Sequence, residues 1–537
     1  MGVYLNSPSA YTFFKREAAK PYFVDKSRML EQLFPLVSEG NHDICITRPR
    51  RFGKTVMANM IAAFFSSTCD SKELFDLLAI SNHQEYKKHL NKYSVIHISF
   101  NEMPMDCTTY DQYINRIAGR LISDLKREYP MVSIVENEAV WDALTDVFVW
   151  DPSVSFIFIL DEWDFIFHQK FITEKDKKRY LSFLNNLLKD KPYALMAYMT
   201  GILPIAKYSS GSELNMFLEY TMVTEGWFSD DFGFTEKEVD LIFERYKKRI
   251  DNPGITREDL KLWYDGYHTY DGERVYNPRS VVASLTNNNL GNYWTSAGPY
   301  DEIFYYIENN VTEVRDDIAF MVSGIPVSAE IKEYAATSMN LQTKDEIFSA
   351  MVVYGFLSYE DQKVSIPNKE LMDKFADMLK KEPALGYVHR LAKESARMLQ
   401  ATLSGDTKAM VEILEYAHDT EVPLLSYNNE SDLTAVVNLV YLSARDSYCI
   451  EREQKSGIGY VDFIFFPRKS GDDGIILELK IGQTPDDAIR QIKEKKYALQ
   501  FRGKLGGHRR HTGKILAVGI TYDKRSKKRE CKIEVLS

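Results

Sequence analysis

The stretch DICITRPRRFGKTVMANMIAAFF, residues 43–65, decides the fold of the front of the chain. Residues 43–47 form a β-rich run, and residues 56–65 have helical composition without Gly or Pro. A strand, a tight loop and a helix bring several backbone N–H groups and a helix N-terminus to one point, which suits a polyphosphate. The sequence therefore predicts a phosphate-binding loop between the two elements.

The residues at the end of this loop suit a nucleoside triphosphate with magnesium. Gly53 permits close approach of the backbone, Lys54 would reach the β- and γ-phosphates, and the Thr55 hydroxyl would ligate the metal. The usual motif opens with a glycine five residues before its second glycine, and Arg48 stands at that position. A bare GKT is as often a chance match as a site, so the rest of the sequence has to decide.

A second motif supports the nucleotide site. SVSFIFILDEWD, residues 153–164, is an apolar strand that ends in acids and reads as a Walker B motif. Asp161 would hold magnesium through water, and Glu162 would orient or deprotonate the water that attacks ATP. The alternative is a buried central strand followed by an acid that caps a helix.

Two further strands are expected at residues 93–101 and 193–201, so the elements alternate as βαβα around a parallel sheet. Thr200 ends the later strand, where ligands gather at the carboxyl ends of parallel strands, and it is a candidate γ-phosphate sensor. One of the three loop arginines is expected to contact ATP, and contact with a partner is the alternative. The residues assigned to the nucleotide are Arg48, Pro49, Arg50, Arg51, Phe52, Gly53, Lys54, Thr55, Asp161 and Thr200.

Length and composition bound the class of protein. At 537 residues the chain exceeds one hydrophobic core, and at least two domains are expected. No run of about 20 apolar residues and no leader-like N-terminus is present, so a cytoplasmic location without a membrane partner is expected. The five cysteines are odd in number, far apart and without CxxC spacing, which argues against structural zinc and a disulfide framework.

Five separated motifs over residues 1–290 resemble the AAA-ATPase-like family that is common in gut bacteria. They are PYFVDKSRML at 21–30, RPRRFGKT at 48–55, DEWD at 161–164, WYDGY at 263–267 and VYNPRS at 275–280. RPRRFGK is the usual form of the loop in that family, so Arg48 fits the resemblance. The resemblance implies a P-loop NTPase sheet that binds ATP and magnesium, with residues 1–232 as the ATPase domain.

The middle of the chain shows no motif for chemistry. Residues 234–251 predict a helix with a capping Thr at its start and basic residues toward its end, which begins a helical lid over residues 233–300. Trp263, Tyr264 and Tyr267 are expected to pack a core rather than to bind a base. Residues 301–424 contain helix-like segments separated by short polar breaks and are interpreted as a helical connector.

The rear of the chain predicts the order α-β-β-β-α-β: a helix at 430–446, strands at 447–453, 460–466 and 474–481, a helix at 486–499 and a strand at 515–520. Asp462 lies in the second strand. Glu478 and Lys480 lie in the third and share one face, because their spacing is two. Two carboxylates with a carbonyl suit magnesium, and a lysine beside them can activate water for in-line attack on a phosphodiester.

The tripeptide ELK alone is more often the end of a surface strand, but the pattern D-x15-E-L-K in this element order resembles the PD-(D/E)XK nuclease superfamily. The resemblance covers about residues 425–537 and implies a small α/β restriction-endonuclease-like domain. In it Asp462, Glu478 and Lys480 would be catalytic, and the two acids would hold the metal. The further polar residues that the resemblance implies are Glu430 and Gln491, with Glu451 and Glu453 as competitors for the role of Glu430.

Charge is unevenly distributed along the chain. The net charge is −10, yet residues 488–537 contain fifteen Lys and Arg against four Asp and Glu, a net charge of +11. The segments 502–514 and 523–530 flank the last predicted strand and could track a phosphate backbone, although a solvated basic surface is equally consistent. No base-reading motif is visible, so no sequence preference is predicted.

Two functions are consistent with these features. The first is an ATP-controlled, magnesium-dependent nuclease that acts on nucleic acid, DNA rather than RNA, with a homo-oligomer left open. The second is an ATP-driven signalling switch whose nuclease-like domain binds nucleic acid or protein without cleaving it. The intact trio Asp462, Glu478 and Lys480 favours the first.

Overall fold

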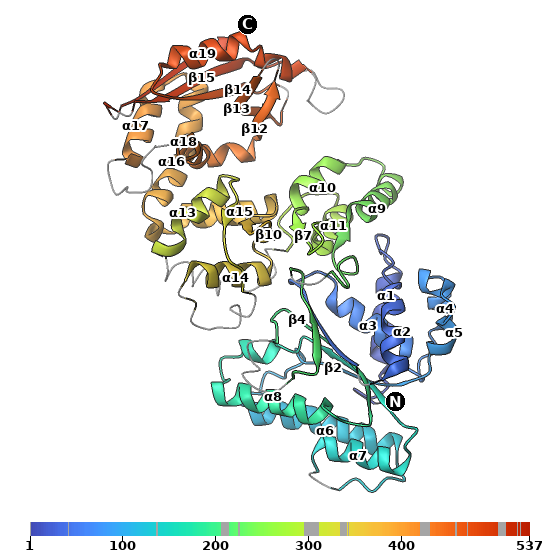
Figure 1. The fold of residues 1–537 in the computed structure, drawn as a ribbon. Coiled ribbons are helices and arrows are strands. Elements are labelled where there is room, and N and C mark those ends of the chain that lie inside the picture. Colours follow the sequence, from blue (N-terminus) through green and yellow to red (C-terminus); the bar gives the residue numbers. More distant parts are fainter. Residues whose placement is uncertain are drawn as a thin grey trace. The chain divides into compact units, whose positions relative to one another are not determined.

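In the computed structural model of the protein, the chain divides into two compact units (Figure 1). Unit 1 contains Met1–Tyr300 and Ala329–Glu370, and unit 2 contains Asp301–Ser328 and Leu371–Ser537. The division cuts across the predicted connector, because residues 329–370 fall in unit 1. The residues that the structure describes are 2–40, 42–135, 138–205, 214–223, 226–294, 311–332, 341, 343–418, 430–456, 459–469, 471–502, 512–523, 525–526 and 528–536.

A five-stranded parallel sheet in the order β2-β3-β4-β1-β5 forms the centre of unit 1. Its strands are β1 (His42–Thr47), β2 (Ser94–Ser99), β3 (Phe156–Asp161), β4 (Ala194–Gly201) and β5 (Phe217–Tyr220). The central strands β1, β3 and β4 are almost continuously apolar because parallel strands are covered on both faces. The predicted parallel sheet and its first four strands are confirmed, whereas β5 was not predicted.

Helices cover both faces of this sheet. Figure 1 shows α6, α7 and α8 on the opposite side of the sheet from α3. The α3 side contains a large apolar core with residues from α1, α2, α3 and four strands, among them Phe14, Leu33 and Ile159. The helices are α1 (Pro8–Ala18), α2 (Met29–Glu39), α3 (Lys54–Phe65), α4 (Lys72–Phe75), η1 (Ala79–Asn82), α5 (Tyr86–His89), α6 (Tyr110–Glu128), α7 (Val140–Trp150), η2 (Phe165–His168) and α8 (Glu174–Leu188).

The expected lid follows the sheet in sequence. Thr235 and Glu238 form a capping box at the start of α9, which confirms the predicted cap. Tyr264 and Tyr267 are buried, as expected for packing residues. The elements are β6 (Phe234–Thr235), α9 (Glu236–Arg249), α10 (Arg257–Tyr264), β7 (Tyr267–His268), β8 (Arg274–Tyr276) and α11 (Pro278–Asn287), with α14 (Lys344–Tyr354), β10 (Ser358–Glu360) and β11 (Lys363–Ser365) further along in unit 1.

Unit 2 contains a mixed sheet in the order β12-β13-β14-β15-β16. Only the pair β14 and β15 is parallel, and α19 makes the crossover that a parallel pair needs. Its strands and crossover helix are β12 (Tyr448–Ser456), β13 (Gly459–Pro467), β14 (Gly474–Ile481), α19 (Pro485–Glu494), β15 (Ile515–Tyr522) and β16 (Arg529–Leu536). The predicted order of elements is confirmed up to β15, and β16 was not predicted.

Helices complete unit 2, and Figure 1 shows α16, α17 and α18 on the opposite side of its sheet from α19. The helix predicted at 430–446 ends at Val440 and continues as a 3-10 turn. The remaining elements are α13 (Val311–Val322), β9 (Val327–Ser328), α15 (Lys369–Lys381), η4 (Pro383–Leu385), α16 (Tyr387–Ser404), α17 (Thr407–His418), α18 (Glu430–Val440), η5 (Leu442–Asp446) and η6 (Tyr497–Arg502). No helix in the described part of the chain combines the length and hydropathy of a membrane span.

Candidate functional site

The backbone of the loop between β1 and α3 is left-handed at two positions. Gly53 is the residue before α3 and has a φ of 95°, and Arg51 has a φ of 70°. A Cβ at position 53 would meet nothing within 4 Å, so glycine is needed there for its backbone angle and not for space. A left-handed conformation costs about 1–2 kcal/mol for a residue with a Cβ, and such strain gathers at functional loops.

Lys54 is held inside this loop. Its Nζ donates hydrogen bonds to the carbonyl oxygens of Arg48, at 2.8 Å, and Pro49, at 2.9 Å, and its side chain is buried. Burial lowers the pKa of Lys54 to about 8, while the nearby acids, Asp164 first, act to raise it. An ammonium group held only by neutral carbonyls can be transferred to a phosphate without separating an ion pair.

Asp161 ends β3 beside this lysine. The register pairs Asp161 with Thr200 on β4, and Thr200 with Ile46 on β1, so the carboxyl ends of three strands meet at the loop. The Asp161 carboxylate is fully buried, and neither oxygen has a hydrogen-bond partner of ordinary geometry among the described residues. Burial raises its pKa to about 7, whereas the neighbouring Thr55 hydroxyl acts to lower it.

Asp161 and Thr55 together fit a magnesium site. A buried carboxylate with unused oxygens is costly unless a cation or a proton compensates it. Asp161 and Thr55 offer oxygen ligands of the kind that magnesium prefers while it keeps several waters. The structure thus brings together the predicted residues Lys54, Thr55 and Asp161.

Within the DEWD segment, Asp164 has a structural role that was not predicted from the sequence. Glu162 is in the left-handed region, with a φ of 52°, and it lines a cavity. The Asp164 Oδ2 accepts hydrogen bonds from the backbone N–H groups of Ile202, at 3.0 Å, and Leu203, at 2.9 Å. Asp164 therefore fastens the turn that carries Glu162 to the end of β4.

Two predicted nucleotide residues use their side chains within the protein. The Arg48 guanidinium donates to the carbonyls of Thr47, Tyr220 and Phe228 and lies over the ring of Phe232, so it supports the loop instead of facing a phosphate. The Thr200 hydroxyl donates to the Ile46 carbonyl at 3.0 Å, and its role as a sensor stays a prediction.

Arg50 and Arg51 both line the cavity. They are therefore the candidates, among the three loop arginines, for the expected contact with ATP.

The cavity next to the loop has a volume of about 700 Å³, within the usual range of sites for cofactors and small ligands. Its aromatic and apolar wall comes from the segment PYFVDKS and from the lid, and it suits a nucleobase. Arg279, at the start of α11, adds a cation. The lining residues that the sequence reasoning did not assign include Tyr22, Phe23, Val24, Phe165, Phe234 and Arg279.

The rear site is built on the neighbouring strands β13 and β14. Asp462 Oδ2 accepts a hydrogen bond from the Leu479 N–H at 2.7 Å, which places it beside Glu478. Glu478 is 2% exposed, and its Oε1 accepts from Lys480 Nζ, at 2.9 Å, and from Gln491 Nε2. Its Oε2 is buried and has no hydrogen-bond partner of ordinary geometry in the described part of the chain, although the Asp462 backbone N–H acts to lower the pKa of Glu478.

Burial raises the pKa of Glu478 to about 7, the Asp462 charge acts in the same direction, and Lys480 opposes it. Asp462 and Glu478 offer two carboxylates of the kind that magnesium prefers, and water would have to supply the further ligands. No cluster of three or more His, Cys, Asp or Glu that could hold a metal occurs among the described residues. Tyr497 also lies here: burial raises its pKa, Gln491 hydrogen-bonds to it, and both acids act on it. The sequence reasoning missed Tyr497.

The remaining candidates of the rear are less defined. Glu430 is the first residue of α18, but its side chain and that of Glu453 lie outside the described residues. Glu451 pairs with Ile464 in the strand ladder. Most of the basic segment 502–514 also lies outside the described residues, and Lys532 of the tail is paired with Asp486 and Glu534. Part of the positive charge of the tail is therefore neutralised locally.

Comparison with known proteins assigns two segments. Residues 10–210 match the model of the predicted AAA-ATPase family, and residues 429–531 match that of the PD-(D/E)XK nuclease superfamily. An uncharacterised protein of the vnfD 5′ region of Azotobacter chroococcum is 25% identical over 296 residues. That match covers 53% of each chain, so the chain spans about half the length of this relative.

Two solved structures show a limited likeness to this chain. A Walker-type ATPase of Pyrococcus abyssi has 13% identity and a TM-score of 0.35, over 65% of this chain and 94% of that one. Cdc6p of Pyrobaculum aerophilum has 11% identity and a TM-score of 0.28, over 70% and 98%.

The raised pKa of Glu478 predicts a pH-dependent stability. Below its ordinary pKa of 4.5 the group is protonated in both the folded and the unfolded chain, whereas above about 7 the folded chain carries a buried charge. Wild-type stability should therefore fall between these pH values. Glu478→Gln should stabilise the metal-free protein at pH 8 by roughly 3 kcal/mol, at about 1.4 kcal/mol per pKa unit, and have little effect at pH 4.

Thermal unfolding in a chelator at both pH values measures this difference. Glu534→Gln, on the same sheet, is the matched control, because Lys493 and Lys532 lower the pKa of Glu534. The control should give no gain at pH 8. A Glu478→Gln protein no more stable than wild type at pH 8 would contradict the assignment of a buried charge.

Proposed function

We propose that this chain, whose front matches the predicted AAA-ATPases and whose rear matches the PD-(D/E)XK nucleases, is an ATP-controlled, magnesium-dependent nuclease acting on nucleic acid, with DNA as the preferred substrate. One observation supports both halves: each contains a buried carboxylate with an unused oxygen near a lysine. Asp161 lies near Lys54 in unit 1, and Glu478 contacts Lys480 in unit 2.

In the front module, Lys54 would exchange the carbonyls of Arg48 and Pro49 for the β- and γ-phosphates of ATP. Thr55 and Asp161 would hold magnesium, directly or through water. Glu162 lines the cavity and is the candidate to orient the attacking water, and the Asp164 contacts keep its turn in place. Magnesium, when bound at either site, would neutralise charge on the phosphates.

Two parts of the cavity wall would contact the nucleotide outside its phosphate end. Tyr22 and Phe23 supply aromatic surface for the base, and Arg279 supplies a cation from the lid. Since Arg279 belongs to α11 and Lys54 to α3, ATP would contact both the ATPase domain and the lid. ATP binding and hydrolysis could thereby alter the position of the lid.

In the rear module, Asp462 and Glu478 would be the metal ligands, and Lys480 would orient or activate water. Gln491 donates to the same Glu478 oxygen as Lys480, so these two donors leave Oε2 as the oxygen available for a cation. Such a geometry suits in-line attack on a phosphodiester. We place this module in residues 425–537, the ATPase domain in 1–232, the lid in 233–300 and a connector in 301–424, of which residues 329–370 belong to unit 1.

The first test of the front module is Lys54→Ala. Loss of a buried cation from the phosphate loop should weaken ATP binding on the order of 100-fold, measured with a fluorescent ATP analogue.

Glu162→Gln should keep affinity within about threefold and lower ATP turnover by roughly 10²-fold or more. Unchanged turnover in Glu162→Gln would remove this glutamate from the mechanism.

The rear module is tested with Asp462→Ala and Glu478→Ala in one chain. Loss of both carboxylates should reduce cleavage by on the order of 10³-fold while nucleic-acid binding, measured by gel shift, stays within about threefold. The assay uses single- and double-stranded DNA and RNA, with and without ATP and magnesium. If the wild-type chain cleaves none of them, the protein is instead an ATP-driven switch that binds without cutting.

A further inference from the structure

The WYDGY motif has no role in the proposed chemistry, yet its last residue packs against the phosphate loop. Phe52 of the loop is buried, and its ring meets the Tyr267 ring edge-on, with centroids 5.0 Å apart at 87°. The Phe52 carbonyl faces the Gly233 N–H at 3.4 Å. The loop is thus anchored to the lid through Phe52.

Tyr267 connects this anchor to the segment of α14, β10 and β11. Its hydroxyl donates to the Gly355 carbonyl at 3.0 Å. Gly355 follows α14 with a φ of 83°, and a Cβ there would lie 2.6 Å from the Cβ of Pro49. These contacts therefore form a closed series that begins and ends in the phosphate loop and runs through Pro49, Gly355, Tyr267 and Phe52. We call this series the rear joint; it lies within unit 1 and is not part of the rear site of unit 2.

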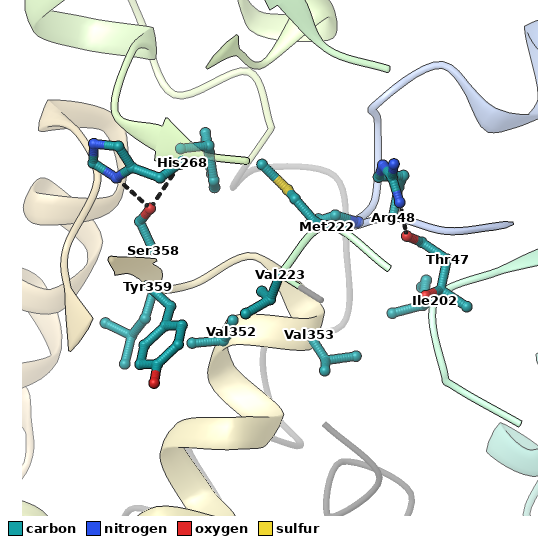
Figure 2. A pocket seen from close by; sticks show the side chains of 13 residues that line it. Thr47, Arg48, Ile202, Met222, Val223, His268, Val352, Val353, Ser358 and Tyr359 are labelled. Carbon is teal, nitrogen blue, oxygen red and sulfur yellow. Dashed lines mark hydrogen bonds between the residues drawn. The ribbon is translucent and has the colours of Figure 1, made fainter. Parts of the chain in front are cut away.

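Other residues of the lid hold the same segment in place. A Cβ on Gly266, whose φ is 106°, would lie 2.0 Å from the Pro367 carbonyl oxygen, so only glycine fits. The His268 N–H donates to Ser358 Oγ at 2.9 Å. Figure 2 shows His268 and Ser358 on one side of a small pocket that Thr47 and Arg48 line on the other.

The rear joint meets the ATP site at Pro49. The Pro49 carbonyl accepts a hydrogen bond from Lys54, and the Pro49 ring lies against Gly355. When Lys54 turns to a phosphate, this carbonyl loses its donor, and the peptide that carries Pro49 is free to shift relative to Gly355.

We infer that Tyr267 and Gly355 are positioning residues of the ATP site, and that residues 343–370 respond to its occupancy through the rear joint. The inference rests on the proposed ATP binding. Coupling is reciprocal, so a change at Gly355 alters nucleotide affinity as nucleotide alters the packing at Gly355.

The test compares Gly355→Ala with Gly405→Ala in the full chain. Both glycines follow a helix with similar backbone angles, but a Cβ at position 405 would meet nothing within 4 Å. Gly355→Ala should weaken binding of a fluorescent ATP analogue roughly fivefold or more, the lower end of coupling between sites, and Gly405→Ala should not. Equal affinities in the two variants would overturn the inference alone, whereas a wild-type chain that binds no ATP would overturn the proposed function with it.

A second pair of variants keeps the test informative if Gly355→Ala does not fold. Tyr267→Phe removes the bond to Gly355 and keeps the ring on Phe52. Tyr264→Phe removes a hydroxyl that donates to the Gly291 carbonyl and accepts from the Gly291 N–H, and neither residue belongs to the rear joint. Nucleotide should alter the rate of hydrogen exchange of residues 352–358 in wild type and Tyr264→Phe, and alter it less in Tyr267→Phe. An identical effect of nucleotide on hydrogen exchange in all three proteins would overturn the inference.

Discussion

A buried carboxylate whose charge the protein does not fully compensate is the constraint on which both candidate sites depend. Asp161 and Glu478 are almost completely buried, and burial raises the pKa of each to about 7. The surrounding fold maintains this unfavourable state: three parallel strands end around Asp161, and two strands with α19 enclose Glu478. A lysine close to each acid reduces the cost without removing it, so a cation bound at either site would add stability.

The strands that were easiest to recognise from the sequence are those whose burial is uniform. Parallel strands covered on both faces read as apolar runs, and this made β1, β3 and β4 recognisable. In the two five-stranded sheets, the missed strands are edges, and the short strands of the two three-stranded sheets were missed as well. FLEY of β5 is only four residues long, and RECKIEVL of β16 mixes charged with apolar residues because it pairs on one side only.

The candidate sites divide in the same way. Lys54, Thr55 and Asp161 were predictable because each stands next to the strand or helix that positions it. The direction of the Arg48 side chain was not, since its acceptor on Tyr220 lies 172 residues further along the chain. Tyr497 likewise reaches the rear site only after α19 has folded onto the sheet, and no local pattern marks it.

The rear joint also explains how a phosphate loop can lack its usual first glycine. A loop of flexible residues would need to be ordered by its ligand, at a cost in conformational entropy. Here the Arg48 guanidinium is fixed by three carbonyls and Phe52 by Tyr267, so the loop is ordered by distant segments of the chain before nucleotide arrives. Such a loop cannot adjust by itself. If ATP binds as proposed, a shift of the loop would therefore pass to the segments that hold it, and residues 343–370 are among them.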